Sequence, residues 1–192
     1  MMNPLSLVVI GGSAGSLEVL LQMLPGLDVP LAVAIIIVLH RKSYADSVLI
    51  DLFSSRTRLL VKEVEEKDLL QPGTIYLAPP DYHLLLESNG SLSLDYSEKI
   101  NFSRPSIDVT FSSAARLYGP RLLAILLSGA NADGVLGLHH VHKMGGMVAV
   151  QDPNSAEVRY MPQQAVEQGG VDKILQVKEI APFINKFAAV TR

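Results

Sequence analysis

The first forty residues follow an order of buried strand, helix and buried strand. Residues 5–10 and 31–39 are continuous apolar runs rich in β-branched side chains, which is typical of strands covered on both faces of a parallel sheet. Leucines at helical spacing lie between these runs, and Pro25-Gly26 ends that helix. This pattern predicts a βαβ unit.

The same order returns in the second half of the chain. Residues 121–128 and 147–150 are expected to be buried strands, and residues 134–143 the helix that joins them. Two alternating runs between residues 83 and 96 flank Asn89-Gly90, a dipeptide that favours a tight hairpin.

Three further helices complete the predicted elements. They cover residues 106–118, the segment from Met161-Pro162 to Gly169-Gly170, and the surroundings of residues 180–187. The sum is an α/β fold with a doubly wound, mostly parallel sheet, helices on both faces and one antiparallel β-hairpin.

Length and composition narrow the class of protein. A chain of 192 residues favours one domain, spanning residues 1–192. A hydrophobic share of 48%, a charged share of 18% and a net charge of −3 are typical of a globular protein. They disfavour nucleic acid as a partner. Because the chain has no cysteine, any nucleophile is an oxygen or a lysine nitrogen.

No segment is expected to insert into a membrane. The longest apolar run, residues 30–39, has about half the length that a membrane-spanning helix needs. No basic segment precedes Leu5, as a signal peptide would require. We therefore expect a cytoplasmic location, whereas nothing in the sequence indicates an oligomeric state.

Three polar residues follow three of the predicted strands. Ser13 comes after the first strand, His40 after the second, and Asp133 after the strand that ends near Leu127. Reactive groups in open α/β sheets gather beyond the carboxyl ends of the strands. Serine, histidine and aspartate are the nucleophile, general base and orienting carboxylate of a catalytic triad. The sequence therefore predicts such a triad at this edge.

Residues 11–15 also match G-x-S-x-G, the elbow that exposes a serine at a strand-to-helix turn. In the α/β-hydrolase fold, where this elbow is typical, the triad residues follow one another along the chain as Ser, Asp, His. Here the order is Ser13, His40, Asp133, so that fold is excluded. Backbone amides after Ser13 and in the loop 129–133 are candidate donors to an oxyanion.

Each of these residues also has a simpler interpretation. A first strand-to-helix turn needs small residues, with Ser13 or Ser16 capping the helix, and His40 or Asp133 could likewise serve as a cap. A nucleotide site is a further alternative, in which Arg41 would hold a 2′-phosphate, but the glycines do not form G-x-G-x-x-G.

Two other clusters are expected to carry no chemistry. His139, His140 and His142 suit a metal by spacing, but their predicted helix offers no carboxylate ligand, so we expect an exposed face and no metal. The charged run "KEVEEKD" at residues 62–68 is expected to be solvated.

Several segments together resemble one family. They are "VVIGGSAG", "IIIVLH", "LAPPDYHL", "RPSIDVTF", "LLSGANADGVLGL" and "AVQDPNSAEVRYMPQQAV". In this order, over residues 7–170, they resemble the catalytic domain of the bacterial chemotaxis protein-glutamate methylesterase, CheB.

The resemblance implies an activity and roles for the same three residues. Ser13 matches the nucleophile, His40 the general base and Asp133 the aspartate that orients it. The family hydrolyses glutamate methyl esters on transmembrane chemoreceptors, and related members deamidate glutamine, both through an acyl-serine intermediate without metal or organic cofactor. The implied partner is a methylated chemoreceptor or a similar signalling protein.

The chain also departs from the family's pattern. Ser16, Arg41 and the pair Ala130-Asn131 stand where a glycine, a methionine and a Met-Gly pair are usual. The chain begins directly at its first strand, so the family's N-terminal receiver domain, with its control by phosphorylation, is not expected. These departures keep a second hypothesis open: a non-catalytic module of the same fold that binds a receptor or another signalling protein.

Overall fold

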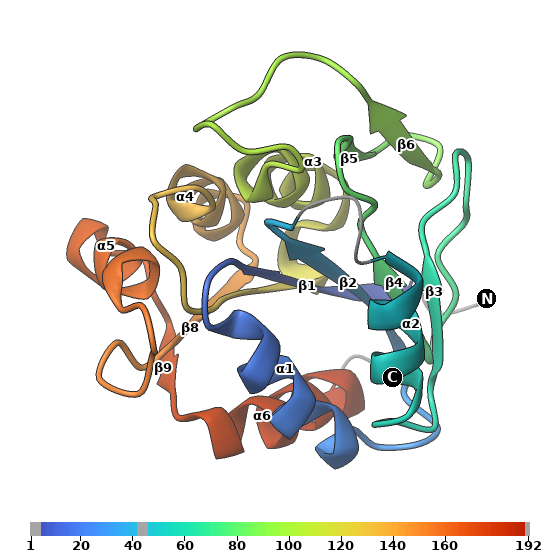
Figure 1. Ribbon diagram of the computed structural model, residues 1–192, viewed down its shortest axis with the longest axis horizontal. Helices are drawn as coiled ribbons and strands as arrows, with labels where there is room; N and C mark the ends of the chain where they lie inside the picture. Colours follow the sequence, from blue (N-terminus) through green and yellow to red (C-terminus); the bar gives the residue numbers. More distant parts are fainter. Residues whose placement is uncertain (1–4, 42–45, 191–192) are drawn as a thin grey trace.

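The computed structural model describes residues 5–41 and 46–190 (Figure 1). A parallel sheet of seven strands forms its centre, in the order β3–β4–β2–β1–β7–β8–β9. The strands are β1 (Ser6–Gly12), β2 (Val33–Leu39), β3 (Leu60–Glu63), β4 (Thr74–Leu77), β7 (Leu122–Leu126), β8 (Met147–Gln151) and β9 (Lys173–Leu175). A separate antiparallel hairpin joins β5 (His83–Leu86) to β6 (Leu92–Asp95).

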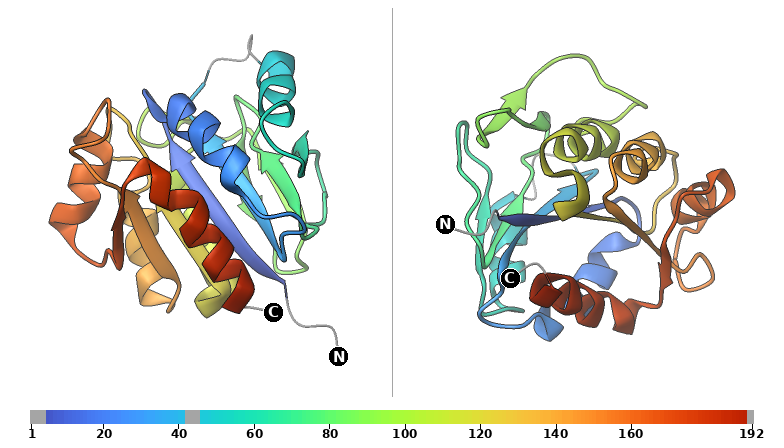
Figure 2. Two further views of the ribbon diagram at one scale, coloured as in Figure 1. Left: turned by 90° about the horizontal axis from the view of Figure 1, so that it is seen from below. Right: turned by 180° about the vertical axis from the view of Figure 1, so that it is seen from behind.

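Helices cover both faces of this sheet, as Figures 1 and 2 show. One face carries α1 (Ser16–Met23), α2 (Asp46–Ser54) and α6 (Val177–Val190). The other carries α3 (Ile107–Tyr118), α4 (Val135–Lys143), α5 (Tyr160–Gln168) and the β5–β6 hairpin. Short 3₁₀ turns follow α1 (Leu24–Gly26) and α3 (Gly119–Arg121). The predicted fold class, with its hairpin around Asn89-Gly90, is confirmed.

The two layers of helices explain the continuous apolar runs. Along β1, Val8 and Ile10 belong to the core beneath α1 and α6, whereas Leu7 and Val9 belong to the core beneath α3 and α4. All four side chains are fully buried. A strand buried on both faces needs no polar alternation.

The order of the strands determines which loops meet. β1 lies between β2 and β7, with Gly12 paired to Leu39 and Gly11 paired to Leu126. The chain leaves β1 toward one side of the sheet and later fills the other side from β7 onward. The carboxyl ends of these three strands therefore lie next to one another at the point where the strand order reverses.

Several elements were absent from the prediction. Helix α2 and strands β3, β4 and β9 are short, and the three strands lie toward the two ends of the sheet order. No helix in the described part of the chain is long and apolar enough to cross a membrane.

Helices α3 and α4 pack closely through Gly137. A Cβ atom at Gly137 would lie 2.7 Å from the Cβ of Phe111 and 3.1 Å from the carbonyl oxygen of Asp108. We expect Gly137→Ala to lower the free energy of unfolding by about 1–2 kcal/mol, because overpacking exceeds the gain in helix propensity. Urea unfolding measures this, with His139→Ala on the exposed face of the same helix as control. Equal stability of the two variants would contradict the close packing.

Candidate active site

Backbone hydrogen bonds hold Ser13 directly after β1. Its amide donates to the carbonyl oxygen of Ser128 at 2.9 Å, in the loop after β7. Its own carbonyl oxygen accepts from the amide of Ser16 at 3.1 Å and from the Ser16 hydroxyl at 2.5 Å. The Ser13 side chain is half-buried. The turn therefore fixes the backbone of Ser13 on both sides and leaves its hydroxyl accessible.

The capping interpretation of these residues is wrong for α1 and α4. The N-cap of α1 is Gly15 and that of α4 is Gly134, both with left-handed backbone, and neither helix has a side-chain cap. A Cβ at Gly15 would lie 2.7 Å from the Ser128 hydroxyl. Glycine at position 15 thus satisfies both the positive φ and the close approach of the neighbouring loop.

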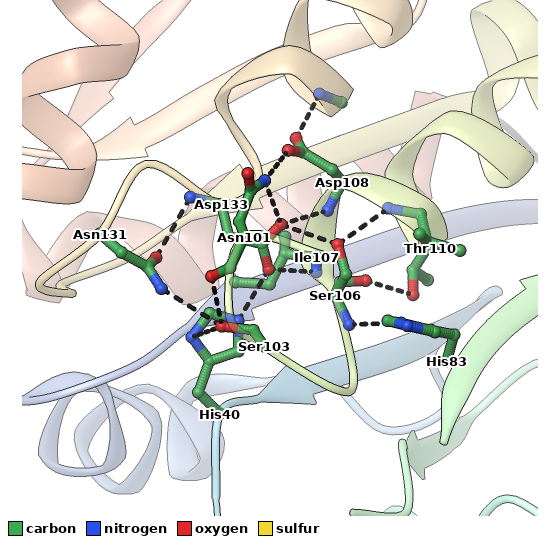
Figure 3. A network of polar contacts seen from close by, with 12 residues as sticks. His40, His83, Asn101, Ser103, Ser106, Ile107, Asp108, Thr110, Asn131 and Asp133 are labelled. Carbon is green, nitrogen blue, oxygen red and sulfur yellow. Dashed lines mark hydrogen bonds and ion pairs between the residues drawn. The ribbon is translucent and has the colours of Figure 1, made fainter. Parts of the chain in front are cut away.

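His40 and Asp133 form a direct contact across 93 positions of sequence (Figure 3). The Nε2 atom of His40, at the end of β2, lies 2.7 Å from Oδ2 of Asp133, in the loop between β7 and α4. Asp133 is fully buried, whereas the His40 side chain is 13% exposed. The sheet thus brings together two of the three predicted residues.

The start of α3 supplies most other partners of the Asp133 carboxylate. It accepts hydrogen bonds from the amides of Ile107 at 2.6 Å and Asp108 at 3.2 Å, and from the Ser106 hydroxyl at 2.8 Å. A helix N-terminus favours negative charge because its first amides lack partners within the helix. A charge in this position can be buried without losing its hydrogen bonds.

These contacts determine which ring nitrogen of His40 carries the proton. Burial would raise the pKa of Asp133, but the hydrogen bonds from His40, the Ile107 amide and Ser106 outweigh it and lower that pKa below its usual value. An ionised carboxylate only accepts hydrogen bonds, so Nε2 of a neutral His40 carries the proton. Nδ1 then keeps a lone pair and is the basic nitrogen.

The basic nitrogen lies beside a cleft that Ser13 also borders. Nδ1 is 3.4 Å from the hydroxyl of Ser103. Among the described residues no hydrogen bond joins it to the Ser13 hydroxyl, but Ser13 and His40 line the same cleft of about 270 Å³. Catalytic hydrogen bonds are often long or unformed without substrate. The remaining walls come from Ser16, Leu17, Leu39, Arg41, Val48, Leu49 and Leu52.

Backbone amides near Ser13 remain available to an oxyanion. The amides of Ser13 and Gly129 are occupied by the carbonyl oxygens of Ser128 and Val158, at 2.9 and 3.0 Å. The amides of Ala14 and Ala130 have no hydrogen-bond partner among residues 5–41 and 46–190. The two expected sources of donors, the turn after Ser13 and the loop 129–133, thus each contain an amide without a partner.

Sequence reasoning assigned no role to a group of residues around the histidine and aspartate. The side-chain Nδ2 of Asn101 donates to Oδ2 of Asp108 at 2.9 Å and to Oδ1 of Asp133 at 3.4 Å. Asn131 donates to the Ser103 hydroxyl at 3.2 Å. The segment "RPSIDVTF", noted only for its resemblance, supplies Ser106 and Asp108. The one available signal was the serine, Ser106, at the first position of a predicted helix.

Arg41 is tied into the protein beside the cleft. Its guanidinium donates to Oε2 of Glu63 at 2.8 Å and to the carbonyl oxygen of Ala78 at 3.2 Å. Glu63 belongs to the charged run expected to be solvated, in which Lys62 also pairs with Asp68 at 2.9 Å. These residues have structural partners, which a charge count could not indicate.

The histidine cluster lies away from this chemistry. His139, His140 and His142 are exposed on α4, and the Nδ1 of His140 lies 2.8 Å from the Ser112 hydroxyl. Within the described ranges no three His, Asp or Glu side chains form a group that could hold a metal ion.

The raised pKa of Asp108 makes the stability of the protein depend on pH. Burial raises the pKa of its carboxyl to about 6, the nearby charge of Asp133 acts in the same direction, and the hydrogen bond from the Gly137 amide opposes it. An unfolded aspartate has a pKa of about 3.9. The native state therefore holds this proton more tightly, and the stability this contributes is full below pH 4 and lost as the pH rises through 6.

Asp108→Asn keeps an oxygen for the Gly137 amide and cannot ionise. We expect its free energy of unfolding, relative to the unmodified protein, to rise between pH 4 and pH 8 by about 1–3 kcal/mol. Urea unfolding at the two pH values measures this, and Asp51→Asn on the surface of α2 is the control. A difference that is the same at both pH values would refute the raised pKa.

Comparisons with known proteins identify a family. Residues 8–184 match the family model "CheB methylesterase". A "Putative protein-glutamate methylesterase/protein-glutamine glutaminase" of Leptospira interrogans is 40% identical over 174 residues, covering 91% of this chain and 90% of that protein. A "Protein-glutamate methylesterase/protein-glutamine glutaminase" of Thermotoga maritima is 35% identical over 177 residues, covering 91% of this chain and 52% of that protein.

The fold agrees equally well with a solved structure. The crystal structure of the Thermotoga maritima CheB methylesterase catalytic domain matches with a TM-score of 0.91 and 33% identity. The match covers 95% of this chain and 98% of that one. The chain therefore belongs to the CheB methylesterase family.

Proposed function

We propose that this protein is a protein-glutamate methylesterase in which Ser13, His40 and Asp133 form the catalytic triad. The observation that carries the proposal is the contact of 2.7 Å between His40 and the buried Asp133, at a cleft that Ser13 also lines. Family membership supports the reaction class.

The residues divide the first half of the reaction among them. His40 Nδ1 accepts the proton of the Ser13 hydroxyl as its oxygen attacks the ester carbonyl carbon. The carboxylate of Asp133 stabilises the imidazolium that forms, without taking its proton. The amides of Ala14 and Ala130, which have no partner among the described residues, are the donors we assign to the oxyanion. His40 then protonates the leaving methoxide, so methanol departs and an acyl-serine remains.

In the second half of the reaction, the same groups activate water to hydrolyse the acyl-serine. His40 accepts a proton from water, whose oxygen attacks the acyl carbon, and then returns that proton to the Ser13 oxygen. The products are free serine and a glutamate carboxylate. A glutamine side chain would form the same acyl-serine with ammonia as leaving group, so deamidation is the second reaction we propose for this site.

The substrate we propose is a methylated chemoreceptor or a similar signalling protein. Names of relatives support a glutamate methyl ester as the reacting group. A cytoplasmic location and a single domain over residues 1–192 remain predictions. The nucleotide alternative has lost its main support, because Glu63 and Ala78 bind the guanidinium of Arg41.

Ser13→Ala tests the nucleophile. Methanol release from a methylated receptor should fall by about 10³-fold or more, because the remaining groups cannot form an acyl intermediate. Ser112→Ala, which removes the α3 hydroxyl next to His140 of α4 and not a residue lining the cleft, is the control and should keep the original rate. A Ser13→Ala variant with undiminished methanol release would overturn the assignment.

Covalent labelling separates the enzyme from the non-catalytic alternative. A fluorophosphonate probe should phosphonylate the Ser13 oxygen with loss of fluoride and fail to label Ser13→Ala. Asp133→Asn should label far more slowly, because an amide cannot hold the neutral histidine in the required tautomer. Failure of the unmodified protein to react would favour the non-catalytic module.

A further inference from the structure

A tight turn carries an exposed aromatic ring to the edge of the proposed active site. Ile100 and Ser103 exchange two backbone hydrogen bonds, of 3.2 and 2.9 Å, so that Asn101 and Phe102 form a two-residue turn between β6 and α3. Both have positive φ, +50° and +60°. Such a turn favours asparagine at its first position and glycine at its second. Phe102 therefore occupies the position of a glycine.

No contact within the described part of the fold offsets the strain of a phenylalanine at this position. A bulky side chain at positive φ is strained, and an aromatic ring usually offsets such a cost by burial. The Phe102 side chain is 99% exposed, more than any other large apolar side chain of the described residues. An unfavourable residue without stabilising contacts points to a role outside the folding of this chain.

The neighbours of Phe102 locate that role. Asn101 donates to Asp133, and the Ser103 hydroxyl lies 3.4 Å from Nδ1 of His40, as Figure 3 shows. One position on either side of Phe102, the chain thus touches the proposed catalytic pair. The turn therefore lies directly beside the pair to which a substrate protein would bring its ester.

The base of the loop is also fixed. The guanidinium of Arg104 stacks over the ring of Tyr96 at 3.9 Å and donates to the carbonyl oxygens of Tyr96 and Ser97. Tyr96 in turn contacts Tyr82, with 5.5 Å between the ring centroids. A turn held at its tip and its base has little backbone entropy left to lose on binding.

We propose that Phe102 is a docking residue for the substrate protein, which contacts an apolar side chain next to the methylated glutamate. The proposal rests on the methylesterase function above. A glutamate methyl ester is small and uncharged, so the flanking polypeptide has to provide most of the binding free energy. An aromatic anchor at the rim of the site is the usual means.

Phe102→Gly separates docking from folding. Glycine adopts the positive φ without strain, so the variant should unfold at the same or a higher temperature than the unmodified protein. Its KM for a methylated receptor should rise about tenfold, as for the loss of an aromatic anchor, with the effect in KM rather than kcat. Phe102→Tyr keeps the ring and should restore KM.

The comparison needs a small substrate and a matched surface variant. The ratio of kcat/KM for the methylated receptor to kcat/KM for p-nitrophenyl acetate should fall about tenfold in Phe102→Gly, because the small ester does not reach the turn. Leu60→Ser replaces another exposed apolar side chain, 63% exposed, at the amino end of β3 and so at the opposite edge of the sheet. It should keep the original ratio.

Different failures have different meanings. An unchanged KM in Phe102→Gly, or a parallel loss of melting temperature and kcat, would overturn the docking proposal alone. A change of oligomeric state in Phe102→Gly with unchanged KM would overturn it in favour of self-association. If the unmodified protein cleaves p-nitrophenyl acetate but releases no methanol from the receptor, the proposed substrate fails and the docking proposal fails with it.

Discussion

The buried carboxylate of Asp133 is the charge around which the site is arranged. An ionised group with no exposure to water is costly unless hydrogen bonds replace its hydration. Here the donors come from three parts of the chain: the end of β2, the start of α3 and the turn before it. Loss of the charge would leave these donors unsatisfied as well as leaving the histidine without an orienting partner.

The strand order explains why such distant segments meet. Since β1 pairs with β2 on one side and β7 on the other, the loops after the three strands are neighbours whatever their separation in sequence. Ser128 adds a direct link between them, since its carbonyl oxygen binds the Ser13 amide and its hydroxyl donates to the Ala14 carbonyl oxygen at 2.7 Å. The position of the proposed nucleophile therefore depends on the loop that also carries Asp133.

Much of this arrangement could be predicted from the sequence, because buried strands and amphipathic helices have strong periodic patterns. The strand ends placed His40 and Asp133 at one edge, and the structure has them in contact. The loop around Asn101 could not be predicted, because hydrogen bonds from side chains in irregular segments depend on tertiary geometry. The same holds for Glu63, whose partner Arg41 lies 22 positions away. Polar residues had offered caps for α1 and α4 as an alternative interpretation, but the N-caps are Gly15 and Gly134, where close neighbours and a positive φ favour glycine.

The central position of β1 in the sheet affects how the protein folds during its synthesis. Its neighbour β7 lies more than one hundred positions later in the chain, and pairings of such high contact order form late and slowly. A chain emerging from the ribosome contains Ser13 and His40 long before Asp133. During synthesis the contact between His40 and Asp133 therefore cannot form before β7 and the loop after it have left the ribosome.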